Sequence, residues 1–304
     1  MENNSRFIEK MIRVENDYFP FVQIEFANKD GNLVKGCFLL DTGSTGNWLF
    51  ADAKDFLSPT DKNTEILETV HTLSEDVVSD EHYNFSFNIG SRNFKENFLF
   101  IDTFSFFNVG ERKVFGLLGN GFMKKHRLSL DFNNYVMFET QEVDYETIDA
   151  DKYSYIFSIN KGLNTLGLPT VYMMGKEDYH ILLLDSGSDN NVLSKKLVSE
   201  GNISCSLTDK CDSVKCLNGG ELMPVANVDL SLIGLTNGDE GTLINHSMVV
   251  RLSKKNIIDK IYTGDKESDE QFKPISGIIG CPFISKQGWT IDFVNDLVYV
   301  KKAS

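Results

Sequence analysis

The sequence predicts an all-β protein of two homologous lobes with few short helices, and three observations carry this prediction. The chain has 304 residues, enough for one large domain or two modest ones. An internal repeat divides it near the middle. Most apolar segments in both halves alternate with period two, or form short runs bounded by turn residues, as strands do.

The first repeated motif is an apolar run that ends in Asp. Residues 38–49 read FLLDTGSTGNWL, and residues 182–193 read LLLDSGSDNNVL. The two acids, Asp41 and Asp185, are 144 positions apart, which is close to half of the chain. The motif therefore indicates two copies of one structural unit.

Two further motifs repeat in the same order. Residues 114–132 (VFGLLGNGFMKKHRLSLDF) match residues 275–293 (ISGIIGCPFISKQGWTIDF) without a gap, and residues 83–90 match residues 227–234 as alternating strands that end in Gly. Three motif pairs in one order predict an N-terminal lobe over residues 1–145 and a C-terminal lobe over residues 146–304. The acidic segment 139–152 reads as the linker.

Turn signals and short polar stretches place the remaining elements. Each lobe opens with a hairpin, over residues 21–40 and again over 171–184, because polar turn residues separate two apolar runs. Short helices are expected around residues 51–56, 121–126, 195–200 and 283–287.

Composition excludes several classes of partner. The formal net charge is −14, so nucleic acid is not expected as the main partner. No stretch is long and apolar enough to span a bilayer, so no membrane partner is expected. The first sixteen residues lack the apolar core of a secretory signal. We therefore expect a cytoplasmic protein, or one exported after removal of a signal upstream of Met1.

Cysteine and histidine patterns predict no metal and no cofactor. The five Cys contain no CxxC pair, and the five His contain no HxxxH or HExxH pattern. Reduced structural thiols are expected, with a disulfide within residues 205–216 as the alternative, which requires an oxidising compartment. GLLGNG (116–121) is interpreted as a packing element, and a phosphate loop is the weaker alternative because no GK[ST] follows.

The chemistry of the Asp motif follows from its residues. An Asp that follows three apolar residues is drawn into a core or an interface, and burying it is costly unless it is hydrogen-bonded or shares a proton. Gly at the second following position allows a tight turn and close backbone approach. Between Asp and Gly, Thr42 and Ser186 each offer a hydroxyl that can bond to the backbone of the opposite loop.

The next serines complete the predicted site. We expect Ser44 and Ser188 to donate hydrogen bonds to the outer carboxylate oxygens. Asp131 and Asp292, in the repeated DF steps, are interpreted as turn-capping residues rather than further acids. The predicted supporting residues of the Asp pair are Thr42, Gly43, Ser44, Ser186, Gly187 and Ser188.

These motifs resemble the aspartic proteases of the pepsin and retropepsin clan. The shared pattern is an apolar pair, D-[TS]-G-[ST] and a later apolar-apolar-Gly, which occurs here as LLDTGS with GLLG and as LLDSGS with GIIG. The short lobes look like bacterial retropepsin-like domains in tandem, whereas Trp48, seven residues after Asp41, is similar to the Trp of pepsins. The resemblance implies the bilobed, double-psi acid-protease fold.

The resemblance also implies an activity. Asp41 and Asp185 would share one proton, activate a water and hydrolyse peptide bonds of an extended peptide or protein substrate between the lobes. The alternative is a pseudoprotease that binds peptides without cutting them. Because both acids lie in one chain, a monomer is expected to be sufficient.

Two segments are candidate flaps over such a cleft. They are residues 69–81, with Leu73 and Ser74, and residues 214–224, with a hairpin tip at Asn218, Gly219 and Gly220. Two candidates favour the retropepsin-like arrangement. Tyr83 is an alternative flap tyrosine, although it begins an expected strand.

Overall fold

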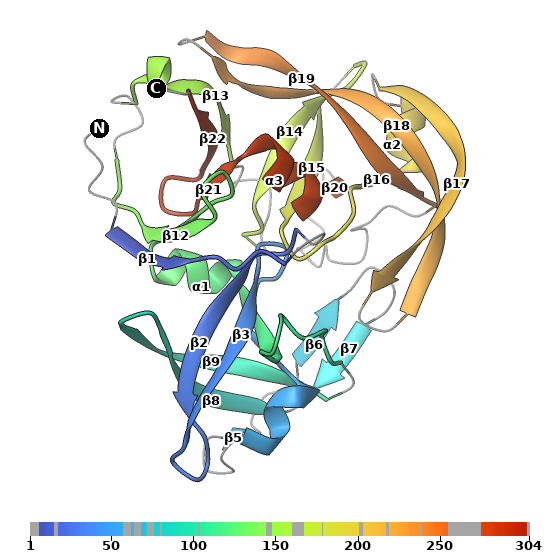
Figure 1. Cartoon of the computed structure of the whole chain (residues 1–304). Helices are drawn as coiled ribbons and strands as arrows, with labels where there is room; N and C mark the ends of the chain where they lie inside the picture. Colours follow the sequence, from blue (N-terminus) through green and yellow to red (C-terminus); the bar gives the residue numbers. More distant parts are fainter. Residues whose placement is uncertain are drawn as a thin grey trace, which may run out of the picture.

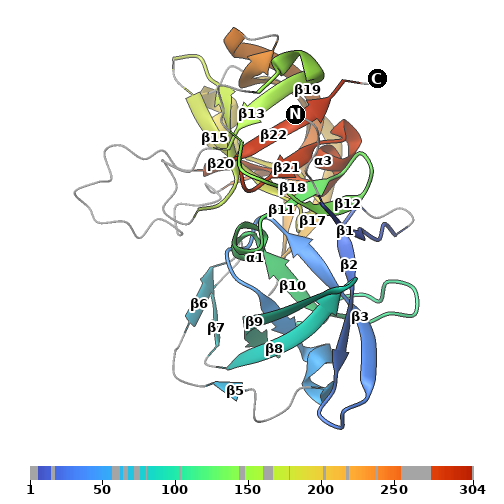
Figure 2. The ribbon, with the colours of Figure 1, turned by 90° about the vertical axis from the view of Figure 1, so that its left-hand side faces the viewer.

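The computed structural model contains two β-rich lobes, with strands β11 and β12 between them (Figures 1 and 2). The predicted all-β fold with few short helices is confirmed. The structure describes residues 6–14, 18–56, 62–63, 68–71, 76–79, 81–102, 104–143, 148–159, 167–177, 179–200, 203–216, 219–236, 239–254 and 275–302.

Strands of the two halves follow the repeat. The first half contains β1 (Arg6–Lys10), β2 (Phe21–Ala27), β3 (Leu33–Asp41), β4 (Trp48–Phe50), β5 (Lys62–Asn63), β6 (Glu68–His71), β7 (Asp76–Ser79), β8 (His82–Ile89), β9 (Arg92–Ile101), β10 (Val114–Gly119), β11 (Leu128–Asp131) and β12 (Val136–Glu139). The second half contains β13 (Tyr153–Ser158), β14 (Thr170–Met174), β15 (Tyr179–Asp185), β16 (Val192–Ser194), β17 (Ser204–Cys216), β18 (Gly219–Thr236), β19 (Asp239–Ser253), β20 (Ile275–Gly280), β21 (Thr290–Asp292) and β22 (Leu297–Lys301).

In the first half, a seven-stranded sheet has the order β2-β3-β10-β4-β9-β8-β5. Strand β3 pairs in parallel with β10, which places Gly119 opposite Asp41. Strand β10 also pairs antiparallel with β4, and β4 pairs in parallel with β9. Since β10 lies between the two strands that the Asp41 loop connects, it holds both ends of that loop.

The second half is connected in the same way. Strand β15 pairs in parallel with β20, and Gly280 lies opposite Asp185. Strand β20 pairs antiparallel with β16, and β16 pairs in parallel with β19. Both GLLG and GIIG strands are buried at every position, which explains their continuous apolar sequences.

Backbone hydrogen bonds join the halves. In the larger sheet, strands from both halves follow one another in the order β1-β12-β11-β21-β22-β13. At its centre, β11 pairs antiparallel with β21, with Leu130 opposite Ile291. Each half therefore contributes three strands to a shared layer, and we propose residue 145 as the boundary between the lobes.

The repeated DF steps are turns, as predicted. The Asp131 carboxylate accepts the backbone N–H groups of Asn133 and Asn134 at 2.8 and 3.0 Å. Asp292 accepts those of Val294 and Asn295 at 3.0 and 3.1 Å. Both acids cap turns, which confirms their structural interpretation.

The four helices that the sequence predicts are present and short, and a further 3₁₀ helix, η4, falls within the segment expected as the linker. The 3₁₀ helix η1 and helix α2 have the expected bounds, and α1 and α3 begin one and two residues earlier than expected. No helix in the described part of the chain is long and apolar enough to cross a membrane. The helices are η1 (Ala51–Phe56), α1 (Asn120–Lys125), η4 (Ala150–Lys152), α2 (Lys195–Glu200) and α3 (Cys281–Gln287).

The strands that end in Asp carry buried apolar side chains on both faces. Leu40 and Leu184 belong to the main core. Leu39 and Leu183 belong to two smaller clusters, one in each lobe. Because side chains alternate along a strand, Asp41 projects on the same face as Leu39, and Asp185 on the same face as Leu183. We call this the Asp face of each sheet.

Three cysteines in the described part of the chain are free thiols: Cys37 is buried, Cys205 is half-buried and Cys211 is exposed. Cys281 is buried, and its thiol donates to the carbonyl of Tyr18 at 2.7 Å. Burial raises the pKa of the Cys37 thiol to about 11, so this thiol stays protonated and unreactive near neutral pH.

One buried histidine makes the C-terminal lobe sensitive to acid. The His246 side chain is 8% exposed, lies among the rings of Tyr155, Phe283 and Trp289, and has no hydrogen-bond partner for Nε2. Burial lowers the pKa of His246 from 6.5 to about 4. The folded protein holds His246 as the neutral ring, whereas the unfolded chain binds a proton there below pH 6.5. The contribution of His246 to the unfolding free energy is therefore present above pH 6.5 and is lost as the pH falls toward 4.

We expect His246→Phe to remove this sensitivity. A pKa difference of this size corresponds to about 3 kcal/mol of unfolding free energy, lost by the wild type between pH 6.5 and 4. Urea unfolding of both proteins at pH 7.5 and pH 4 measures it. Between pH 7.5 and pH 4, the unfolding free energy of His246→Phe should fall less than that of the wild type, by about that amount. Equal losses in the two proteins would show that His246 is not the group responsible.

Candidate active site

The two repeated Asp residues meet where the lobes join. Asp41 and Asp185 end β3 and β15, are half-buried and share a side-chain hydrogen bond. Each is also packed against the glycine of the opposite loop: a methyl group on Gly43 would overlap the Asp185 carboxyl, and one on Gly187 would overlap that of Asp41. Only glycine lets the two loops approach this closely.

Four buried hydrogen bonds join the loops. The Thr42 hydroxyl donates to the carbonyl of Leu184 at 2.7 Å and accepts the N–H of Ser186 at 2.9 Å. The Ser186 hydroxyl donates to the carbonyl of Leu40 at 2.6 Å and accepts the N–H of Thr42 at 3.0 Å. Each hydroxyl thus connects one lobe to the backbone of the other, and the arrangement fixes the distance between the acids.

Backbone N–H groups orient the carboxylates. The N–H groups of Gly43 and Gly187 donate to Oδ1 of Asp41 and Asp185, both at 2.9 Å. The prediction that the following serine hydroxyls donate to the outer carboxylate oxygens is wrong. Ser44 donates instead to the carbonyl of Gly46, and Ser188 to that of Asn190, both at 2.9 Å. A hydroxyl can donate one hydrogen bond, and here a carbonyl two residues ahead accepts it.

The protonation of the pair follows from its surroundings. Burial raises the pKa of both carboxyl groups. The pKa of Asp185 lies well above its ordinary value because the charge of Asp41 adds to the effect of burial. Hydrogen bonds from Asp185 and from nearby N–H groups limit the rise for Asp41. Two carboxyl groups in contact therefore hold one proton between them into weakly acidic solution.

Two asparagines that the sequence analysis missed hold the Asp loops against the GLLG and GIIG strands. Oδ1 of Asn47 accepts the N–H of Gly119 at 3.1 Å, and Oδ1 of Asn191 accepts that of Gly280 at 2.9 Å. Both asparagines stand at the same position of the repeated motif, six residues after Asp. The repetition of Asn at this position is the sequence feature from which both residues could have been predicted.

Comparisons with known proteins bear on the fold. No protein-family model matches the sequence, and no curated protein sequence matches it. Among solved structures, the chain is similar to the aspartic proteinase from Irpex lacteus, with a TM-score of 0.51 and 12% identity over 99% of this chain and 98% of that one. The chain has an aspartic proteinase fold. At this identity the likeness extends to the fold alone.

The first predicted flap of this aspartic proteinase fold is in part a hairpin. Strands β6 and β7 form a separate two-stranded antiparallel sheet. Leu73 and Ser74 fall between them and lie outside the described residues. Tyr83, the alternative flap tyrosine, lies instead in β8, where its hydroxyl donates to Glu81 at 3.4 Å.

The second predicted flap is the turn between β17 and β18. These strands pair up to Cys216 opposite Gly219, with Gly220 opposite Lys215. Asn218 lies outside the described residues. Val214 and Met223, close to the turn of this hairpin, pack in the cluster on the Asp face of the C-terminal lobe, so this end of the hairpin is on the side of the dyad.

The site contains no metal-ligand set within the described residues: no group of three or more His, Cys, Asp and Glu side chains is arranged to hold an ion. The polar groups around the two acids are backbone N–H groups and hydroxyls. The backbone N–H groups orient the carboxylates, and the hydroxyls hold the two loops together. The arrangement is suited to acid–base chemistry on a water molecule.

Proposed function

We propose that the chain is an aspartic endopeptidase that hydrolyses peptide bonds between its two lobes. The observation that supports this most is the contact between Asp41 and Asp185, which are brought together by two copies of one loop. Keeping two acids in contact costs free energy, because both are half-buried and like-charged when ionised. Four cross-lobe hydrogen bonds hold the acids together despite this cost, and such an arrangement is typical of a catalytic site.

In the proposed mechanism, the pair works with one shared proton. The charged carboxylate takes a proton from a water molecule as the water attacks the scissile carbonyl carbon. The protonated carboxyl donates its proton to the carbonyl oxygen, which gives a neutral tetrahedral diol. The carboxyl that gained the water proton then donates it to the amide nitrogen, while the other carboxylate takes a proton from a diol hydroxyl. The C–N bond breaks to give a carboxylic acid and an amine, and the pair again holds one proton. No covalent enzyme intermediate is required.

The substrate proposal is an extended peptide or protein segment. Main-chain hydrogen bonds to the edges of the two hairpins would hold it, and side-chain pockets would select among sequences. One chain would act as a monomer, since it contains both acids. The similarity of the two lobes in sequence supports the finer proposal of a tandem, retropepsin-like origin.

A peptide-cleavage assay tests the function. Wild-type protein is incubated with a diverse peptide library at intervals from pH 3 to pH 8, and products are identified by mass spectrometry. Endopeptidase activity predicts internal cuts with a defined sequence preference. Binding of peptides with no cleavage at any pH would instead favour a pseudoprotease.

A further inference from the structure

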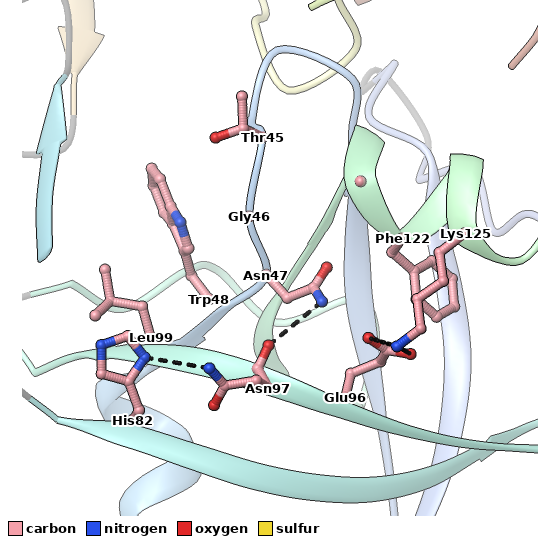
Figure 3. Close-up of a pocket in the computed structure, with 11 residues that line it drawn as sticks. Thr45, Gly46, Asn47, Trp48, His82, Glu96, Asn97, Leu99, Phe122 and Lys125 are labelled. Atoms are coloured by element: carbon pink, nitrogen blue, oxygen red, sulfur yellow. Dashed lines mark hydrogen bonds and ion pairs between the residues drawn. The ribbon is translucent and has the colours of Figure 1, made fainter. Parts of the chain in front are cut away.

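A second polar site lies beside the Asp41 loop. A cavity of about 230 Å³ is bounded by Trp48 and Leu99 on its apolar side and by Asn47, His82 and Asn97 on its polar side (Figure 3). This volume accommodates one amino-acid side chain rather than a larger ligand. No step of the proposed mechanism uses it.

Three residues of the cavity, Trp48, Leu99 and His82, project on the Asp face of the N-terminal sheet, whereas Glu96 and residues of α1 complete its lining. Neighbouring strands place five side chains in one row across the sheet. Residues directly opposite each other in paired strands project to the same face. Leu39, which shares its face with Asp41, therefore shares it with these three cavity residues as well. The row is Leu39, Leu117, Trp48, Leu99 and His82.

The distance fits an extended peptide. Strand β9 is the third strand from β3 in the order β3-β10-β4-β9. At roughly 4.8 Å between strands, the cavity lies about 14 Å from the strand that ends in Asp41, a span of about four residues of extended chain. A peptide cut at the dyad can therefore reach the cavity with a side chain within about four residues of the cut.

The polar wall is built from side-chain amides and an imidazole. His82 is 4% exposed, and the side-chain amide of Asn97 donates to its Nδ1 at 3.4 Å. The side-chain amide of Asn47 donates to the Asn97 carbonyl, also at 3.4 Å. These contacts hold Asn97, itself exposed, at the mouth of the cavity (Figure 3). Its amide can both donate and accept.

The charges at the cavity edge cancel. Lys125 contacts both carboxylate oxygens of Glu96, at 2.8 and 2.9 Å. His126 contacts the same carboxylate at 2.6 Å. Glu96 is buried and the more exposed Lys125 is bound to it, so each of the two charges already has the other as its counter-charge.

At the equivalent described positions, the C-terminal lobe carries other side chains. By the pairing of strands, Val225, Val249 and Arg251 occupy the places of His82, Asn97 and Leu99. Arg251 is bound to Asp212 at 2.7 Å. The polar cavity is therefore a property of one lobe and not of the repeated scaffold.

We propose that this cavity is a substrate subsite that selects an uncharged, hydrogen-bonding side chain, such as Gln, Asn, Ser or Thr. The proposal rests on the proposed peptidase function, and it adds one position of sequence preference. An apolar side chain in the cavity would displace water from the polar wall without replacing its hydrogen bonds. A charged side chain would find no unpaired counter-charge there.

The test is a positional comparison of peptides. Peptides that share one cleaved sequence carry Gln, Leu, Glu or Lys at each position within four residues of the cut, and kcat/KM is measured for wild type and Asn97→Leu. The matched control is Asn93→Leu, since Asn93 is an exposed asparagine on the same face of β9, outside the cavity. Binding of the same peptides to the Asp185→Asn protein gives a readout independent of cleavage.

At one position, wild type and the Asn93→Leu control should prefer Gln over Leu by roughly tenfold, the worth of one net hydrogen bond. Asn97→Leu should abolish or invert that preference there and change no other position. Equal preferences in wild type and Asn97→Leu, or no binding of any peptide, would overturn the subsite. If the Asp185→Asn protein binds with the Gln preference but wild type cuts nothing, the subsite stands and the peptidase function fails.

Discussion

Replacing either acid of the pair by Asn should abolish peptide cleavage while leaving the fold intact. Asp41→Asn and Asp185→Asn each keep the size of the side chain, but a pair with one amide can no longer both accept a proton from water and donate one to the carbonyl. We expect kcat/KM to fall by at least roughly 10³-fold in each variant. The measurement is cleavage of one library-derived peptide by wild type and both variants.

Thermal unfolding separates loss of chemistry from loss of structure. Neither variant should melt at a lower temperature than wild type, because an Asn amide can replace the hydrogen bond of the shared proton and cannot add a second negative charge to the pair. Asp30→Asn, in an exposed turn after β2, is the matched control and should be fully active. Full activity in either dyad variant would contradict the proposed mechanism.

The second large effect concerns the hydroxyls that join the lobes. Ser186→Ala removes one donor and one acceptor, and leaves the carbonyl of Leu40 and the N–H of Thr42 buried without these partners. Two unsatisfied buried groups cost about 2–4 kcal/mol together. For a protein of this size, that corresponds to a fall in Tm of about 5–10 °C. Thr42→Val should have a similar effect, because Thr42 makes the equivalent pair of bonds.

Differential scanning calorimetry checks this prediction. Ser199→Ala is the matched control, since Ser199 is exposed and its hydroxyl bonds only within its own helix in the described contacts. Its Tm should stay within about 1 °C of wild type. If Ser186→Ala were as stable as the Ser199→Ala control, the cross-lobe hydrogen bonds would not be what holds the Asp loops together.

Much of this architecture could be predicted from the sequence, because it is repeated. Strands that must be buried on both faces need continuous apolar runs, and the tight turn after them needs Gly. The run before Asp41 and its copy before Asp185 therefore mark the same structure twice. The bounds of α2 were predictable for a similar reason, since a polar segment directly follows a buried strand.

The details that sequence could not give are those that depend on tertiary contacts. The sequence does not specify the acceptor of the Ser44 hydroxyl. The path of the folded loop determines that this acceptor is the carbonyl of Gly46. Asn47 repeats as Asn191, yet its partner, the N–H of Gly119, is 72 residues away in the chain. The polar cavity depends on three strands lying side by side, β4, β9 and β8, which no local pattern specifies.

The most direct test of the shared-proton dyad is the pH dependence of kcat/KM for wild-type protein. A pair that works with one proton predicts a bell-shaped profile: the rate falls at low pH as a second proton binds, and at high pH as the last proton leaves. Because the pKa of Asp185 is raised well above that of an ordinary Asp, activity should persist into weakly acidic solution. A rate that continued to rise into alkaline solution would contradict the dyad mechanism.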